Sequence, residues 1–239
     1  FTIENADHSS AGGAIGMAGG YGVGLYINDC LFQDNNTSGH GGAVRLVAQA
    51  SGGTITNSDF INNTSDQNGG AVNWNATYVH DHLIADCTFI GNSAASGGAI
   101  NVTPGSNSHA VPLIESSVFR NNSASADGGA VFNTNGAGTG PLRIHQSEFT
   151  GNSAPTGAAL GGQTYWHGEY YLENCVVTEN TGGYAIHAVG NRVQSDYPVD
   201  MAFTTVANNP GGGIYARGDG LGLRVRNSII ADNGGVGIH

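Results

Sequence analysis

Ionisable side chains recur on the short segment that precedes a repeated hydrophobic position of this sequence, where Asp200 stands beside the position that Glu115, His145 and Glu173 share. Glu115, His145 and Glu173 are separated by 30 and 28 residues, and Asp200 follows 27 residues after Glu173. Carboxylates and imidazoles are the groups of general acid–base catalysis, and glycosidic bonds are hydrolysed by pairs of carboxylates. If the fold brings these residues onto one surface, they form a catalytic set for a polysaccharide hydrolase or lyase. The alternative is that charges simply alternate across a sheet and reduce repulsion.

Aromatic and imidazole side chains gather in the variable segments between the repeated motifs. The predicted ligand-binding residues in these segments are Trp74, His80, His109, Trp166 and His167. Exposed aromatic rings stack on sugar rings, and neighbouring polar groups bind sugar hydroxyls. The alternative is that these segments fold over and bury their own rings. Two histidines in one such segment are too few to indicate a metal site, so neither a metal nor a cofactor is predicted.

A repeat of about 28 residues must position all of these groups. A hydrophobic residue followed three places later by Asn recurs eight times, and Gly-Gly-Ala followed by Val or Ile comes a few residues after several of these Asn residues. An aliphatic residue stands five places before the hydrophobic one. The repeated Asn residues are Asn35, Asn63, Asn92, Asn122, Asn152, Asn180, Asn209 and Asn233. Asn5 fits as a further copy, with Thr2 at the hydrophobic position.

The repeat predicts an all-β fold rather than stacked helices. Each unit contains short β-type segments and no stripe of apolar residues at helical spacing. We therefore expect a right-handed parallel β-helix of about nine coils, each of 24 to 30 residues with three short strands. The fold is expected to form one domain over residues 1–239. Ile and Phe of successive coils would stack inside it, and the repeated Asn residues would form a ladder in a tight turn.

The three cysteines support this alignment of the repeats. Cys30, Cys87 and Cys175 stand two residues before the repeated hydrophobic position, where other units carry Ser or Thr. A small residue at a bend explains this exchange. Cys30 and Cys87 are two coils apart, or about 10 Å, which exceeds the Cα separation that a disulfide spans. We expect three buried free thiols.

Composition excludes several classes of protein. The chain contains 40 Gly, 18 acidic and 7 basic residues, with a net charge of −11. This charge argues against nucleic acid as a partner. No apolar segment approaches the length of about 20 residues that a membrane-spanning helix needs.

The paired motifs resemble a known family. Phe89 and Asn92 followed by Gly97-Gly98-Ala99-Ile100, with the equivalent residues of other units, are similar to the repeats of polymorphic outer membrane proteins and of bacterial right-handed β-helix surface proteins. The resemblance implies an exported, extracellular or cell-surface protein. It also implies a non-catalytic adhesin, passenger region or structural rod.

The remaining expectations concern partners. The partner would be a host or matrix glycan, or a surface protein, bound on the side that carries the variable segments and the recurring ionisable residues. Neither end of the sequence shows a capping pattern, so further coils or neighbouring subunits are expected at the ends, as in a segment of a longer chain. The polysaccharide-degrading enzyme remains the alternative.

Overall fold

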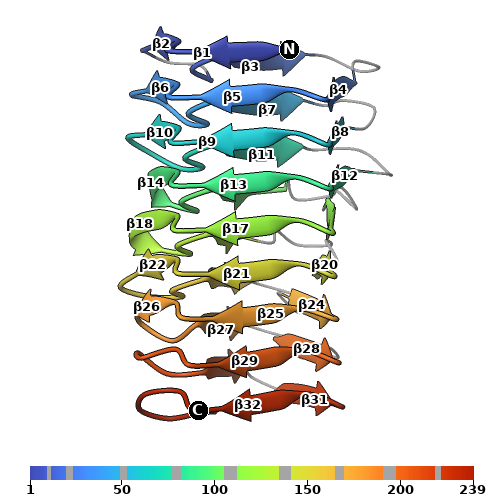
Figure 1. The fold of residues 1–239 in the computed structure, drawn as a ribbon, viewed down its shortest axis with the longest axis vertical. Helices are drawn as coiled ribbons and strands as arrows, with labels where there is room; N and C mark the ends of the chain where they lie inside the picture. Colours follow the sequence, from blue (N-terminus) through green and yellow to red (C-terminus); the bar gives the residue numbers. More distant parts are fainter. Residues whose placement is uncertain are drawn as a thin grey trace.

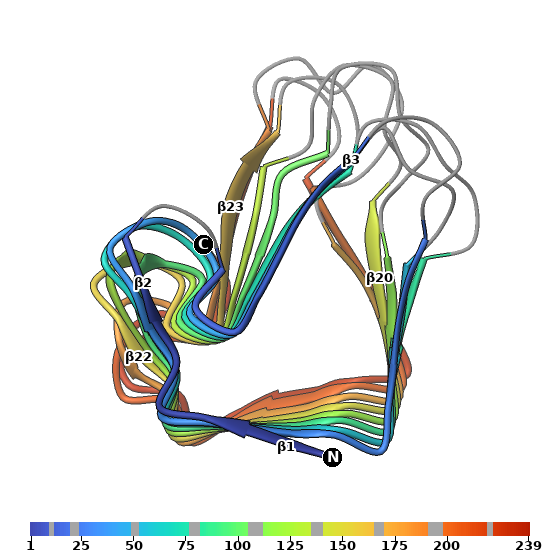
Figure 2. The same ribbon diagram turned by 90° about the horizontal axis from the view of Figure 1, so that it is seen from above.

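The chain winds as a right-handed parallel β-helix in the computed structural model (Figures 1 and 2). The structure describes residues 1–9, 12–19, 24–48, 53–76, 82–104, 112–134, 141–164, 170–190, 198–218 and 222–239. Seen from the N-terminal end in Figure 2, the chain runs clockwise as it moves away from the viewer. All strand pairs among the described residues are parallel. These residues contain no helix, and hence no helix that could span a membrane. The predicted fold class is confirmed.

Sheet A has nine strands and forms one flat side of the β-helix. Its strands are β1 (Thr2–Glu4), β5 (Leu31–Gln33), β9 (Asp59–Ile61), β13 (Thr88–Ile90), β17 (Val118–Arg120), β21 (Glu148–Thr150), β25 (Val176–Thr178), β29 (Thr205–Ala207) and β32 (Ile229–Ala231). The repeated hydrophobic position is the middle residue of each strand and points inward.

Sheet B has seven very short strands on the arm that projects at the left of Figure 2. Its strands are β2 (Asp7–His8), β6 (Asn36–Thr37), β10 (Thr64–Ser65), β14 (Ser93–Ser96), β18 (Ser123–Asp127), β22 (Ser153–Ala154) and β26 (Thr181–Gly182). These strands correct the expectation of three strands per coil, because most coils have four. The additional strand follows the Asn turn and consists mainly of Ser, Thr and Ala, so it has no alternation of apolar and polar residues that would predict a strand.

Sheets C and D complete the wall around the interior (Figure 2). Sheet C contains β3 (Ile15–Gly19), β7 (Val44–Ala48), β11 (Val72–Ala76), β15 (Ile100–Val102), β19 (Val131–Asn133), β23 (Leu160–Thr164), β27 (Ile186–Gly190) and β30 (Ile214–Gly218). Sheet D contains β4 (Leu25–Asn28), β8 (Gly53–Thr56), β12 (Leu83–Ala85), β16 (Leu113–Glu115), β20 (Leu142–His145), β24 (Tyr170–Glu173), β28 (Val199–Ala202) and β31 (Leu223–Arg226).

A column of phenylalanines runs through the interior behind sheet A. Phe32, Phe60, Phe89, Phe119 and Phe149 are buried and stack in sequence, with ring centroids 4.7 to 4.9 Å apart. That separation is the spacing of neighbouring strands. Each aromatic contact contributes about 0.5 to 1.5 kcal/mol beyond the burial of area. The stack therefore fixes the coils in register with one another.

The predicted asparagine ladder is present beside this stack. Asn92, for example, donates from Nδ2 to the Phe60 carbonyl at 2.9 Å and to Asn122 Oδ1 at 2.9 Å. Its own Oδ1 accepts hydrogen bonds from the Asn63 backbone and side-chain amides. The ladder continues through Asn233, because Asn209 Nδ2 donates to Asn233 Oδ1 at 2.8 Å. Each buried amide thus receives the partners that burial requires.

The first coil differs from the predicted alignment by one residue. Ile3 pairs with Phe32, so Ile3 rather than Thr2 takes the inward hydrophobic position. Ala6 then takes the ladder position, and its backbone amide donates to Asn35 Oδ1 at 3.0 Å. Asn5 instead adopts the left-handed conformation of the corner, with φ 55°.

The Gly-Gly pair is required by the sharp turn from sheet B into sheet C. Gly97 has φ 63°, in the left-handed region that favours glycine. A Cβ atom on Gly98 would lie 2.1 Å from the Gly129 carbonyl oxygen of the next coil. The first glycine therefore supplies a backbone conformation, and the second permits close contact between coils.

The bend between sheets D and A explains the exchange of Cys with Ser and Thr. Ser117 Oγ donates to the Glu115 carbonyl at 2.8 Å and accepts the Cys87 backbone amide at 3.3 Å. Cys87 Sγ makes the equivalent contact with the Ala85 carbonyl at 3.1 Å. The three cysteines are free; Cys87 and Cys175 are buried as predicted, whereas Cys30 is only half-buried.

Candidate ligand-binding site

The outer face of sheet D brings together the ionisable residues that the repeat spacing aligns. Glu115 pairs with His145, and His145 pairs with Glu173, on three adjacent strands. Arg143 and Tyr171 form the neighbouring outward column of the same strands. Inward residues such as Ile114 alternate with them and are buried. Alternation along each strand thus directs the charged side chains outward on a rigid, packed sheet.

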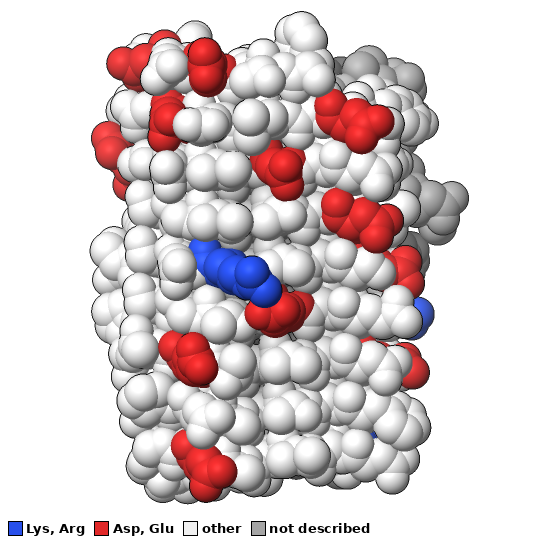
Figure 3. All heavy atoms as spheres, in the orientation of Figure 1, with Lys and Arg blue, Asp and Glu red and all other residues white. Residues whose placement is uncertain are grey.

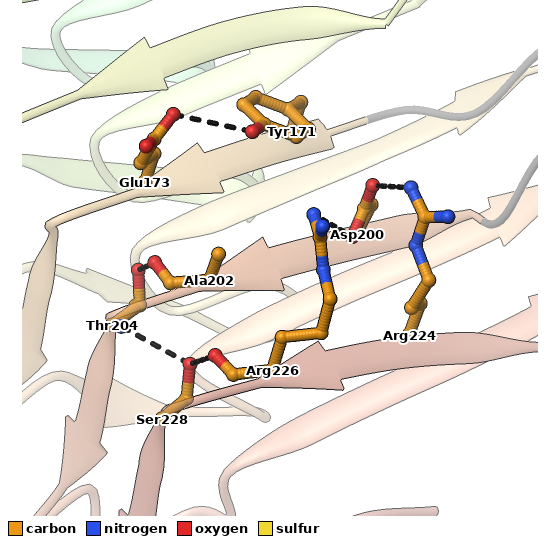
Figure 4. Close-up of polar contacts among 8 residues, drawn as sticks. All are labelled: Tyr171, Glu173, Asp200, Ala202, Thr204, Arg224, Arg226 and Ser228. Carbon is orange, nitrogen blue, oxygen red and sulfur yellow. Dashed lines mark hydrogen bonds and ion pairs between the residues drawn. The ribbon is translucent and has the colours of Figure 1, made fainter.

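Arg143, His145, Tyr171 and Glu173 line a shallow pocket of about 350 Å³ together with Pro141. Tyr171 Oη donates a hydrogen bond to Glu173 Oε2 at 3.1 Å (Figure 4). The His145 ring meets the Tyr171 ring edge to face, with centroids 5.8 Å apart. His145 Nε2 is buried and has no hydrogen-bond partner among the described residues. The pocket therefore combines a cation, a carboxylate, a phenol and an imidazole.

Asp200 lies one strand beyond this pocket and is already paired. Both Arg224 and Arg226 form ion pairs with its carboxylate, the second at 3.2 Å (Figure 4). The Asp200 side chain is only 11% exposed, whereas the two arginines are about half exposed. The three residues thus tie β28 to β31. Because its carboxylate is engaged by two arginines one strand beyond the pocket, Asp200 lies apart from the other residues of the predicted acid–base set.

Trp74 contradicts the expectation of an exposed aromatic platform. It lies in β11, where Val72 and Trp74 point inward and Asn73 points outward, and its side chain is fully buried. Its indole ring crosses to sheet D, where a Cβ atom on Gly53 would lie 2.7 Å from it. The His82 ring packs against it edge to face at 5.1 Å. Trp74 is therefore a core residue that fills the space left by a glycine.

The other four predicted ligand-binding residues lie outside the described part of the structure. They are His80, His109, Trp166 and His167. Among the described residues, no group of three or more His, Cys, Asp or Glu side chains could hold a metal ion.

A second group of rings, which no sequence motif predicts, lies on the outer face of sheet C. The His187 and Tyr215 rings stack at 4.8 Å, and Tyr215 stacks on His239 at 5.0 Å. Burial lowers the pKa of His187 below its usual value, which favours the neutral imidazole. Their shared position in the repeat could have predicted this contact, because His187 and Tyr215 both follow the first buried residue of a sheet C strand.

Comparison with known families gives one match. The model of the Chlamydia polymorphic membrane protein repeat matches residues 86–103 and 116–134. These two segments run from the D–A bend through the Phe and Asn positions and the Gly-Gly turn to the end of a sheet C strand. No curated protein and no solved structure matches the chain. The match thus covers the repeated scaffold of two coils and none of the pocket residues.

Proposed function

We propose a function for this chain from its β-helix fold and from the match of two of its coils to the Chlamydia polymorphic membrane protein repeat. It is an exported, non-catalytic rod that is displayed at a cell surface, and it adheres to a partner through the outer face of sheet D. The family match supports the surface location. The pocket on sheet D is the observation that supports the place of contact.

The division between constant and variable positions supports this assignment. The Phe stack, the Asn ladder and the Gly-Gly turns repeat from coil to coil and point inward or into turns. Outward positions of sheet D vary instead, from Thr and Leu in early coils to Arg, Tyr, Glu and His in later ones. Variable side chains on a rigid scaffold are the usual arrangement of a recognition surface.

The outer sides of sheets A and B offer less chemistry. The outer side of sheet A consists mainly of Thr, Val, Ile and Ala, with scattered charges (Figure 3). Arg120 and Glu148 on that side form an ion pair with each other at 3.0 Å. A hollow over sheet B is lined almost entirely by Ser and Ala, with Asp66 at one side. Sheet D is the face on which several different functional groups surround one pocket.

The enzyme alternative depends on Glu115 and Glu173. They occupy the same column two strands apart, a separation of about 10 Å between backbones. That separation is close to the 6.5 to 9.5 Å between the carboxyl groups of inverting glycosidases. However, Glu173 already accepts a hydrogen bond from Tyr171, and Asp200 is paired with arginines. We therefore retain binding as the proposed function.

Adhesion of coated beads tests this proposal. Beads that carry the chain should adhere to cultured mammalian cells, and the double variant Tyr171→Ala, Glu173→Ala should reduce the number of bound beads at least fivefold. The matched control is Thr150→Ala, Thr178→Ala on the outer side of sheet A, which should leave adhesion unchanged.

Two results would overturn the proposal. One is equal adhesion of the wild-type chain and the sheet D variant. The other is depolymerisation of acidic or neutral polysaccharides by the wild-type chain, with the activity lost in Glu115→Gln and Glu173→Gln, since that result assigns an enzyme.

A further inference from the structure

We infer that the sheet D pocket binds a carboxylate-bearing sugar unit, with Arg143 on the ligand carboxylate and Glu173 on its hydroxyls. This inference rests on the proposed function and names the ligand class of its contact face. The lining residues all lie on β20 and β24 or directly before β20, so the pocket is built on packed strands. Its volume of about 350 Å³ lies at the small end of ligand pockets, which suits one sugar ring.

Arg143 supplies the cation of the pocket. Its side chain is exposed, and it makes no hydrogen bond or ion pair among the residues that the structure describes. Arg120, Arg224 and Arg226 each have a carboxylate partner within the protein. In a chain with a net charge of −11, an unpaired arginine beside a pocket is a distinctive feature. The planar guanidinium group matches a carboxylate with two parallel hydrogen bonds, which favours a carboxylate ligand.

Glu173 lies at the diagonally opposite corner of the pocket from Arg143. The two residues are on adjacent strands and in adjacent outward columns, so their backbones are about 8 Å apart. Arg143 and Glu173 form no ion pair with each other, although their charges are opposite. An ionised carboxylate accepts hydrogen bonds and donates none, so Glu173 favours a ligand that presents hydroxyl donors. A ligand with a carboxylate at one end and hydroxyls at the other is complementary to this arrangement.

Tyr171 and His145 orient these two groups. The Tyr171 hydroxyl group donates to Glu173 and holds one carboxylate oxygen, which leaves the other oxygen for the ligand. The edge-to-face contact with His145 fixes the Tyr171 ring on the pocket wall. Aromatic rings in such positions pack against the C–H groups of sugars. The ligand is therefore an acidic sugar rather than a simple inorganic anion. An inorganic anion would be repelled by the Glu173 carboxylate and would offer it no hydroxyl donors.

Calorimetric titration of the whole chain tests the inference. The probes are a glucuronate-bearing oligosaccharide, a sialylated oligosaccharide and the carboxyl-reduced form of each. At least one acidic probe should bind, its carboxyl-reduced form should bind at least tenfold more weakly, and binding should weaken as salt rises. A difference between the two acidic probes identifies which kind of carboxylate the pocket accepts.

Two variants separate the pocket from the rest of the surface. Arg143→Gln should weaken binding of the acidic probe at least tenfold, whereas Arg120→Gln on sheet A should leave it unchanged. Equal binding of the acidic and carboxyl-reduced probes, equal binding by Arg143→Gln, or binding of neither acidic probe would overturn the inference. If the beads adhere to cells but no acidic probe binds, the ligand class is wrong and the adhesive function stands. If an acidic probe binds but the beads do not adhere, the adhesive function fails instead.

Discussion

The carboxylate of Asp127 occupies the space in which any side chain at Gly161 would lie. A Cβ atom on Gly161 would be only 1.8 Å from Asp127 Oδ1. Gly161 belongs to the outward column of sheet C, between Phe132 and His187 of the adjacent strands. Asp127 accepts one hydrogen bond, from the Gly128 backbone amide at 2.8 Å. Burial of this carboxyl group against the glycine raises its pKa to about 7.

Asp127 should make the stability of the protein depend on pH. Its carboxyl group holds a proton to about pH 7 in the folded chain but ionises near pH 4 when unfolded. Its contribution to stability is complete below pH 4 and is lost as pH rises toward 7. Asp127→Asn retains an acceptor for the Gly128 amide and cannot ionise. It should therefore raise the free energy of unfolding by about 1 to 3 kcal/mol at pH 8 and leave it nearly unchanged at pH 4.

Urea unfolding of both chains at pH 4, 6 and 8 measures this difference. The control is Asp66→Asn, because Asp66 is an exposed residue of the same arm. An equal effect of Asp127→Asn at pH 4 and pH 8 would contradict the assignment of a protonated buried carboxyl group.

The asparagine ladder should be the most sensitive part of the polar framework. Asn122 donates to the Phe89 carbonyl and to Asn152 Oδ1, and its Oδ1 accepts two hydrogen bonds from Asn92. Asn122→Ala removes the side-chain partner of several buried groups. It should lower the free energy of unfolding by about 3 to 5 kcal/mol.

Asn36→Ala is the matched control for the ladder. Asn36 is exposed on β6, and its replacement should cost less than about 0.5 kcal/mol. Circular dichroism during chemical unfolding measures both effects. Similar losses for the two variants would show that the ladder does not hold the coils together.

Phe203 should be a destabilising residue at the bend between sheets D and A. Its φ is 52°, in the left-handed region, and the residue is 56% exposed. Other bends carry Asp, Asn, Ser or Gln at this position, including Asn174 and Asn227 on either side. Asn tolerates the left-handed conformation better than a bulky residue. Phe203→Asn should therefore raise the free energy of unfolding by about 0.5 to 1 kcal/mol.

Phe203→Ala separates backbone strain from exposure of the ring. Alanine removes the exposed ring but retains the steric conflict of its Cβ atom at positive φ. Thermal unfolding should show a gain for the Asn variant only. A gain of equal size for the Ala variant would locate the cost in the ring instead.

The three thiols should differ in reactivity. Burial raises the pKa of Cys87 to about 12 and that of Cys175 to about 11, so both remain protonated at pH 8. Thiolates are the reactive form, and Cys30 is the half-buried thiol of the three. Ellman's reagent at pH 8 should therefore modify one thiol in the folded chain and three in guanidinium chloride. Cys30→Ser should abolish the native signal, and rapid modification of all three folded thiols would contradict the burial of Cys87 and Cys175.

The sequence predicts this fold well because each ladder residue needs the same residue in the coils above and below it. The Phe stack and the Asn ladder therefore leave a visible period. Sheet B escapes prediction because strands such as β10 have two residues and no apolar face. The register of sheet D follows from the same period, which is why Glu115, His145 and Glu173 were aligned correctly.

The features that the sequence does not predict depend on the room around individual side chains rather than on the repeat period. Trp74 points inward because Gly53 leaves room for its ring, and no repeat marks such a pairing. Asp127 fits into its half-buried place because Gly161, which lies in a different strand, has no side chain. The ion pairs of Asp200, and the absence of a partner for Arg143 among the described residues, depend on side-chain directions that residue type alone does not specify.

Selective blocking of the three faces tests the central claim most directly, namely that sheet D is the adhesive surface. One accessible cysteine at a time is introduced in a Cys30→Ser background, in which Cys87 and Cys175 stay buried. The positions are Leu113→Cys on sheet D, Thr150→Cys on sheet A and Ser125→Cys on the arm. Each is coupled to a polyethylene glycol maleimide, and adhesion of coated beads to cells is counted before and after coupling. The account predicts that only the Leu113→Cys adduct abolishes adhesion. Equal loss with the Thr150→Cys or Ser125→Cys adduct, or undiminished adhesion of the Leu113→Cys adduct, would contradict it.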